Sequence, residues 1–370
     1  MIKAKMQERI EKRLAEREAE ALLVYSDGSH SLLVPSYLHY VTGTRAMGPS
    51  AVLISRDGRA KWLLEPAWDQ PRVAPLTWIE NVRGTSNLCR DLIVALREFC
   101  PAGQLAVCGT HAMAEDLYAS LESRVKLTPA DDLIEEIARE KTADEVALLW
   151  ELGAIADVGA KALLEHARPG VREFELMARI EHAMRLAGAD DNFLLISSGP
   201  HNHEMHEPTD RILQKGDIVI GEITPGKDAQ FVQLCRTMVL GKPSEAVAST
   251  YDMLLAALRE ALAEVRADSP ANLMSKAMNG VISKAGYAKF CYPPYMRARG
   301  HGFGVGTIAP GGTIEDDTAE PFRRNDAVVV HPNQYLEATG YLACGETVLV
   351  TKAGFERLSK TVTRLESVEV

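Results

Sequence analysis

The chain has 370 residues, of which 46% are hydrophobic and 25% are charged, and its formal net charge at pH 7 is −10. This length suits two domains better than one core, and the composition is typical of a soluble globular protein. The acidic balance without a long run of Lys and Arg argues against a nucleic-acid partner, and no apolar run approaches the roughly 20 residues needed to span a membrane.

The first part of the chain predicts a small α/β domain over residues 1–137. Strands alternate with helices, which is the pattern of such domains. Asp57-Gly58 is a favoured tight-turn pair between two apolar runs and predicts a hairpin. The predicted elements are, in order, an amphipathic helix marked by Ile2, Met6, Ile10 and Leu14, a strand at 21–27, the hairpin at 51–65, a helix at 88–100, a strand at 104–110 and a helix at 114–124.

A second domain is predicted over residues 138–370. Thr142 and Glu145 form a T-x-x-E capping box at the start of a long helix, and Pro169-Gly170 ends that helix. The fold class is therefore α+β. The predicted helices are 143–167, 172–187, 245–266 and 271–285, and the predicted strands are 216–223, 229–241, 326–332 and 346–354.

The compartment is predicted from the N-terminus and the cysteines. Residues 1–20 mix acids and bases, whereas a signal peptide needs an uninterrupted apolar stretch. No CxxC pair occurs, so we expect free thiols in a reducing compartment, which places the protein in the cytoplasm. The six cysteines are Cys89, Cys100, Cys108, Cys235, Cys291 and Cys344.

Several short sequence words follow one another between residues 141 and 354. They are K-T-A-D-E (141–145), A-R-P-G-V-R-E-F-E-L (167–176), S-G-P-H-N-H-E-M-H-E-P-T-D (198–210), G-D-I-V-I-G-E (216–222), C-R-T (235–237), G-H-G-F-G (300–304) and E-T-V-L-V-T-K-A-G (346–354). In this order they resemble the creatinase/prolidase/aminopeptidase P superfamily, peptidase family M24. The resemblance implies a creatinase-type N-terminal domain, a C-terminal pita-bread domain and a homodimer.

The resemblance also implies a metal site made of two Asp, one His and two Glu, which suit two hard divalent ions. At the corresponding positions this sequence has Glu222, Gln233, His301, His331 and Gly345. Only the histidine at 301 is unchanged, and glycine has no side chain to offer. Because the bridging carboxylates are missing, we expect degenerate metal ligands and no dinuclear metallopeptidase centre.

His206 occupies the position at which the family has a proton-transferring histidine. Imidazoles titrate near neutrality, so His206, Glu222, His301 and His331 around one cavity would support acid–base catalysis without metal, as in creatinase. The leading hypothesis is therefore a creatinase-like, metal-independent hydrolase or lyase without a cofactor. It would act on a C–N bond of a small carboxylate-bearing compound.

Three further residues are predicted to bind the substrate. Arg297 stands four residues before His301, at a position that faces substrate in the family, and its guanidinium would clamp a carboxylate. Gln233 would line the same cavity. Arg45 belongs to the segment that family dimers extend toward the neighbouring active site. A structural alternative for Glu222 is an ion pair with Arg236.

Two other functions stay open at this point. Glu222, His301 and His331 have the composition of a two-His-one-carboxylate site, which would hold one iron or zinc ion in a mononuclear hydrolase or lyase. Gln233 and Gly345 instead motivate a catalytically inactive pita-bread binding module. The sequence leaves open the substrate and the choice among hydrolysis, elimination and decarboxylation.

Overall fold

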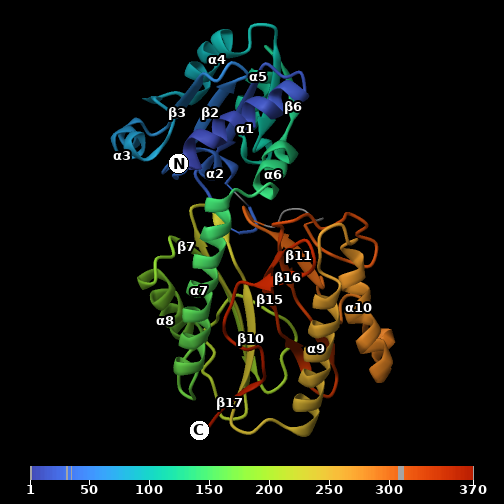
Figure 1. Ribbon diagram of the computed structural model, residues 1–370. Helices are drawn as coiled ribbons and strands as arrows, with labels where there is room; N and C mark the ends of the chain where they lie inside the picture. The colour runs from blue at the N-terminus through green and yellow to red at the C-terminus, as the bar shows by residue number, and fades with distance from the viewer. Residues whose placement is uncertain (1, 31, 35, 307–311, 370) are drawn as a thin grey trace. The chain divides into compact units, whose positions relative to one another are not determined.

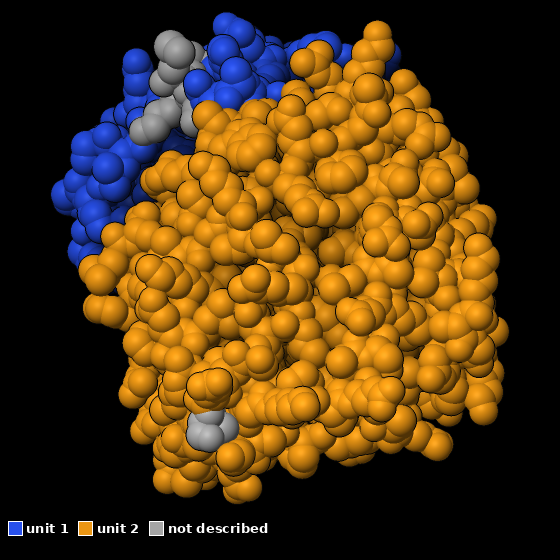
Figure 2. Space-filling model, turned by 60° about the horizontal axis from the view of Figure 1, so that its bottom comes forward, with its two compact units in different colours: residues 1–144 blue, residues 145–370 orange. Residues whose placement is uncertain are grey.

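The computed structural model describes residues 2–30, 32–34, 36–306 and 312–369. The chain forms two compact units, residues 1–144 and 145–370, which are coloured separately in Figure 2. The domain boundary predicted between residues 137 and 138 falls inside a helix, α6 (Asp131–Arg139), whose apolar residues are buried. The division between units comes after that helix.

The first unit is built on a six-stranded sheet in the order β4-β3-β2-β1-β5-β6. Strands β1, β2 and β3 pair antiparallel, and the other neighbours pair parallel. Its strands are β1 (Ala21–Ser26), β2 (Ser50–Ser55), β3 (Ala60–Leu64), β4 (Asn81–Gly84), β5 (Gln104–Cys108) and β6 (Lys126–Pro129). Its α-helices are α1 (Ile2–Glu16), α2 (Tyr37–Thr42), α3 (Gln70–Val73), α4 (Leu88–Phe99), α5 (Glu115–Glu122) and α6.

Both faces of this sheet are covered, which explains the unbroken apolar run of β1. All six β1 residues are buried, and α4 packs Leu92 and Leu96 into the same cluster as Leu23. The predicted stripe of α1 is confirmed at Met6, Ile10 and Leu14, all of which are buried. The predicted hairpin is confirmed as β2–β3, with Gly58 at the φ of +87° that its turn requires.

The described strands of the second unit form three sheets. A five-stranded sheet has the order β17-β10-β8-β7 with β9 paired to β8, a four-stranded sheet has the order β11-β12-β15-β16, and β13 pairs with β14. The α-helices are α7 (Ala143–His166), α8 (Glu173–Leu186), α9 (Glu245–Ala263) and α10 (Asn272–Ile282). The strands are β7 (Asp191–Gly199), β8 (Ile218–Lys227), β9 (Gln230–Phe231), β10 (Leu234–Leu240), β11 (Gly300–Phe303), β12 (Ala327–Val330), β13 (Asn333–Leu336), β14 (Gly340–Ala343), β15 (Glu346–Val350), β16 (Phe355–Arg357) and β17 (Glu366–Val368).

Helices flank the strands of this unit on two sides. Figure 1 shows α7 and α8 on one side and α9 and α10 on the other, with β10 and β15 between them. Gly159 lets α7 pack closely against β8, because a Cβ at this position would lie 2.7 Å from the Ile223 side chain. A core cluster joins α9 to the strands and includes Leu254, Ile220 and Val328. The predicted α+β class is confirmed.

No helix in the described part of the chain has both the length and the hydrophobicity needed to cross a lipid bilayer.

Candidate metal centre

The candidate site begins at the hairpin formed by β8 and β10. Asp228 and Ala229 both have positive φ, 48° and 64°, as the two central residues of a type I′ turn do. This turn pairs Lys227 with Gln230, and the same register places Cys235 directly opposite Glu222. Directly paired residues of an antiparallel ladder project from the same face, so the Glu222 and Cys235 side chains emerge side by side.

The two histidines come from a neighbouring sheet. Strand β11 pairs antiparallel with β12, so His301 near the start of β11 lies beside His331 just after the end of β12. The strands approach closely at Gly300, where a Cβ would lie 2.3 Å from the Val329 carbonyl oxygen. The His331 amide donates to the Arg299 carbonyl at 2.9 Å. Backbone pairing therefore fixes the positions from which the His301 and His331 side chains extend.

Glu222 and His331 face each other without a hydrogen bond. Glu222 Oε1 lies 3.6 Å from His331 Nε2, and both atoms are buried without a hydrogen-bond partner. The residues are only 4% and 6% exposed, respectively. Arg297 Nη1 approaches the same carboxylate oxygen at 3.6 Å. Buried polar atoms without partners are costly, so two of them at this separation indicate a place for a ligand that contacts both.

His301 is held by Gln233. The Gln233 side-chain oxygen lies 3.2 Å from His301 Nε2, and Nδ1 of the same ring lies 3.2 Å from the Gly302 carbonyl oxygen. The Gln233 backbone is itself fixed by Thr347, whose Oγ1 accepts from its amide at 3.0 Å and donates to its carbonyl at 2.7 Å. The side-chain carboxamide of Gln233 therefore orients the His301 ring.

Burial controls the protonation of these groups. It lowers the pKa of His301 to about 4 and, helped by the charges of His301, Arg297 and Arg299, lowers the pKa of His331 to about 3. Burial raises the pKa of Glu222, and Arg297 opposes that shift. The expectation that these imidazoles titrate near neutrality is therefore wrong. Both are neutral at pH 7, and a neutral imidazole is the form that binds metals.

Two predicted residues have their contacts elsewhere. His206, after β7, is half-buried; its amide donates to Ser197 Oγ at 3.1 Å, and its Nδ1 lies 2.8 Å from the Glu207 carbonyl oxygen. Within the ranges that the structure covers, no hydrogen bond or ion pair joins His206 to Glu222 or the two site histidines. Arg45 belongs to the first unit, where its Nε donates to His39 Nδ1 at 3.3 Å. The roles of both residues stay predictions.

The structural alternative, an ion pair between Glu222 and Arg236, is wrong. Arg236 Nη2 lies 3.0 Å from Glu346 Oε1 instead. Adjacent residues of a strand point to opposite faces, so with Cys235 beside Glu222, Arg236 must point away from that carboxylate. The same register reveals Cys235 as the site residue that sequence reasoning missed.

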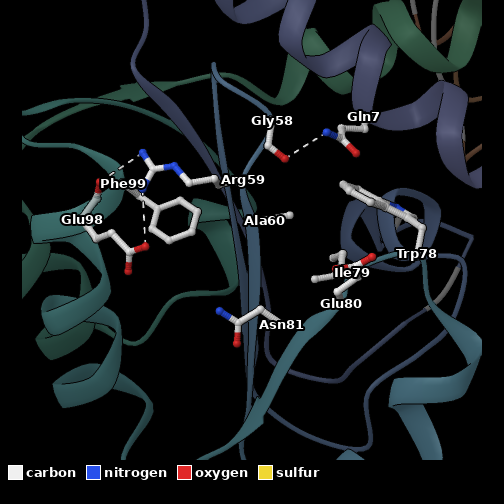
Figure 3. Close-up of a pocket in the computed structure, with 10 residues that line it drawn as sticks. All are labelled: Gln7, Gly58, Arg59, Ala60, Trp78, Ile79, Glu80, Asn81, Glu98 and Phe99. Carbon is white, nitrogen blue, oxygen red and sulfur yellow. Dashed lines mark hydrogen bonds and ion pairs between the residues drawn. The ribbon is translucent and has the colours of Figure 1, made fainter.

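A pocket in the first unit has a different lining. Figure 3 shows one of about 460 Å³ in the first unit, lined by residues that include Arg59, Trp78, Glu98 and Phe99. Glu98 already pairs with Arg59 at 3.4 Å, and the guanidinium lies 5.3 Å from the Phe99 ring centre. This pocket contains none of the predicted site residues.

Known proteins provide an independent comparison. Residues 147–352, more than half of the chain, match Metallopeptidase family M24. The chain is 22% identical over 331 residues to the Xaa-Pro dipeptidase of Pyrococcus furiosus, covering 88% of this chain and 92% of that protein. It is 30% identical over 182 residues to the probable dipeptidase PepE of Mycobacterium tuberculosis H37Rv, covering 48% and 47%.

Solved structures show the same fold. The prolidase of Pyrococcus horikoshii superimposes with a TM-score of 0.84 at 20% identity, covering 98% of this chain and 99% of that chain. The Xaa-Pro dipeptidase of Bacillus anthracis gives a TM-score of 0.83 at 20% identity, covering 99% of each chain. The predicted N-terminal domain followed by a pita-bread domain is confirmed.

These matches correct the predicted chemistry. The expectation of a hydrolase of the M24 type agrees with them, but the metal-independent, cofactor-free reading is wrong because the matching family is one of metallopeptidases. Excluding peptidase chemistry likewise conflicts with relatives named as dipeptidases. The physical reason lies in the site. The prediction considered only how many carboxylates are missing. In the folded chain, Glu222 Oε1 and Nε2 of the neutral His331 ring are both buried without a hydrogen bond.

Proposed function

Since the chain belongs to metallopeptidase family M24, we propose that it is a metal-dependent hydrolase of small, dipeptide-like substrates, with a metal ion held by Glu222, His301 and His331. One observation carries the metal site: Glu222 Oε1 and His331 Nε2 are buried without a hydrogen-bond partner and lie 3.6 Å apart. The substrate class follows the relatives named as Xaa-Pro dipeptidases and a probable dipeptidase.

The donor set suits a borderline divalent ion. One carboxylate and two neutral imidazoles are the ligands of many zinc and iron sites in proteins. Ligands of one zinc ion at about 2.0–2.2 Å stand roughly 3.5 Å apart in a tetrahedral site. The 3.6 Å between Glu222 Oε1 and His331 Nε2 has that spacing. Gln233 would then orient His301, as residues behind metal ligands commonly do.

The surrounding residues also suit a dipeptide. A bound divalent ion would supply a Lewis acid that polarises the scissile carbonyl group. The Arg297 side chain is 51% exposed and yet reaches to 3.6 Å from Glu222, so one end of it touches the site while solvent reaches the rest. A guanidinium in that place would hold the terminal carboxylate of a substrate and fix which bond lies at the metal.

The test is hydrolysis of a panel of dipeptides, with and without a C-terminal proline, after exhaustive chelation and after return of zinc, manganese, cobalt or iron. We expect activity to disappear on chelation and to return with a metal. His331→Gln should abolish the recovery, whereas His182→Gln, at an exposed position of α8, should leave it unchanged. Turnover that survives chelation, or no dipeptide cleavage with any of these metals, would contradict the proposal.

A further inference from the structure

We propose that the Cys235 thiolate is a metal ligand beside Glu222 and His331, so that the centre favours zinc or another thiophilic ion over hard ions. The inference rests on the proposed metal-dependent function and adds a ligand to its site. The Glu222 carboxylate, the Cys235 Sγ and a His331 ring nitrogen all lie within 4.8 Å of one another, and all three residues are buried.

Strand register places the sulfur in the site. Cys235 is paired directly with Glu222 across β8 and β10, so the two side chains share one face. The hydrogen bonding of the Cys235 thiol differs from that of the buried thiols in the first unit. Cys108 donates to the Ala130 carbonyl oxygen at 2.8 Å, and Cys100 contacts Glu20 at 3.3 Å. Among the described residues, the Cys235 thiol has no such partner.

Gly345 leaves room for this arrangement. It forms an isolated antiparallel bridge with Cys235, with hydrogen bonds of 3.2 and 3.1 Å in the two directions. A Cβ at position 345 would lie 3.1 Å from His331 Cδ2 and 3.2 Å from Cys235 Cβ. A longer side chain there would therefore crowd the imidazole and the cysteine. The His331 ring and the Cys235 side chain, both of types that bind metals, occupy the space that a side chain at position 345 would need.

A thiolate also balances the charge of the site. Glu222 supplies one negative charge, and a second anionic ligand would match the charge of a buried divalent ion in full. On binding, the Cys235 S–H bond would break, a sulfur–metal bond would form and the proton would pass to solvent. Carboxylate and thiolate together then neutralise a charge of +2, while the imidazoles stay neutral. Soft sulfur and imidazole ligands select zinc-like ions over magnesium, calcium and manganese.

Cobalt(II) provides a direct test because thiolate ligation produces a sulfur-to-cobalt charge-transfer absorption in the near ultraviolet. The full chain is loaded with cobalt, and bound cobalt is counted by elemental analysis. We expect the band in the wild-type protein and in Cys344→Ser, whose cysteine is equally buried but outside the group. Cys235→Ser should lack the band and bind zinc at least about 100-fold more weakly, since even residues behind the ligands contribute about 10- to 100-fold.

The outcomes separate this inference from the proposed function. Stoichiometric cobalt without the band, or a band that persists in Cys235→Ser and disappears in Cys344→Ser, would overturn the thiolate while leaving the metal site intact. Failure of the wild-type chain to bind cobalt or zinc would overturn both. X-ray absorption of the zinc-loaded wild-type protein needs no variant: a sulfur scatterer at about 2.3 Å supports the thiolate, and a shell of only nitrogen and oxygen refutes it.

Discussion

Two buried glutamates in the second unit have contrasting surroundings. Glu346 Oε1 accepts from Arg236 Nη2 at 3.0 Å and from the Thr363 hydroxyl, whereas its Oε2 is buried without a hydrogen-bond partner. Glu222 has the Arg297 and His331 nitrogens at 3.6 Å, and its Oε1 has no hydrogen bond. Burial raises the pKa of both carboxyl groups.

The contrast separates a structural carboxylate from one available for a ligand. A buried charge with a hydrogen-bonded partner is tolerated by the fold, and removing one partner leaves the other uncompensated. A buried carboxylate without such a partner costs stability, and a bound cation would offset that cost. Glu346 should therefore matter to folding, and Glu222 should matter to metal binding and turnover.

The largest expected effect is on stability at Glu346. Glu346→Ala leaves the Arg236 guanidinium buried without its carboxylate, so the free energy of unfolding should fall by about 3–5 kcal/mol. Urea denaturation of the metal-free protein measures this, with Glu356→Ala on the exposed edge strand β16 as the matched control. If the two variants are equally stable, Arg236 and Glu346 do not form the structural pair described here.

The next effect is on activity at Glu222. Glu222→Gln keeps the side-chain shape but removes the charge, so kcat/KM for dipeptide cleavage should fall by about 100-fold, equivalent to about 2.7 kcal/mol. Metal affinity should fall with it, whereas the stability of the metal-free protein should stay the same or rise because a buried charge is gone. A variant that keeps its metal and loses stability as Glu346→Ala does would make Glu222 a second structural carboxylate.

The smallest effect is a pH dependence at His331. Its pKa is lowered from 6.5 to about 3, so between these values the unfolded chain binds a proton that the folded chain excludes. This contribution to stability is fully present above pH 6.5 and is lost as the pH falls, by roughly 1 kcal/mol per pH unit. The raised pKa of Glu222 has the opposite effect on the pH dependence of stability. Glu222 is present both in the wild-type protein and in His331→Gln, so its contribution is common to both.

Unfolding of metal-free wild-type protein and His331→Gln at pH 7, 6 and 5 measures this slope. Wild-type stability should fall more steeply with acidification than that of the variant. Parallel curves would mean that His331 takes up protons as readily in the folded protein as in the unfolded one.

Much of the fold could be predicted because its signals are local. Two apolar runs and the Asp57-Gly58 turn between them predicted β2 and β3, and the stripe of Met6, Ile10 and Leu14 predicted α1. Strand β7 and the pair β13–β14 were not predicted. Tertiary contacts decide these strands: all nine residues of β7 pair with β8.

The site was predicted only in part because its chemistry depends on strand register. The spacing of the family motifs found Glu222 and His331. Arg236 was considered as a partner of the carboxylate, although it follows Cys235 by one residue and so points to the other face. A one-residue change of position moves a side chain to the other face of a sheet. The Asp228-Ala229 turn was the missing signal, since a two-residue turn there pairs Cys235 with Glu222. The low pKa values of the histidines depend on burial, which the sequence pattern alone does not specify.

Glu222 and His331 lie opposite each other at a distance that suits two ligands of one metal ion. Equilibrium dialysis of the chelated full-length protein against zinc, followed by elemental analysis, tests it most directly. We expect tightly bound zinc in the wild-type chain and in His182→Gln, and its loss in both Glu222→Gln and His331→Gln. Equal zinc retention by the wild-type chain and these two site variants, or no binding by the wild-type chain, would contradict it.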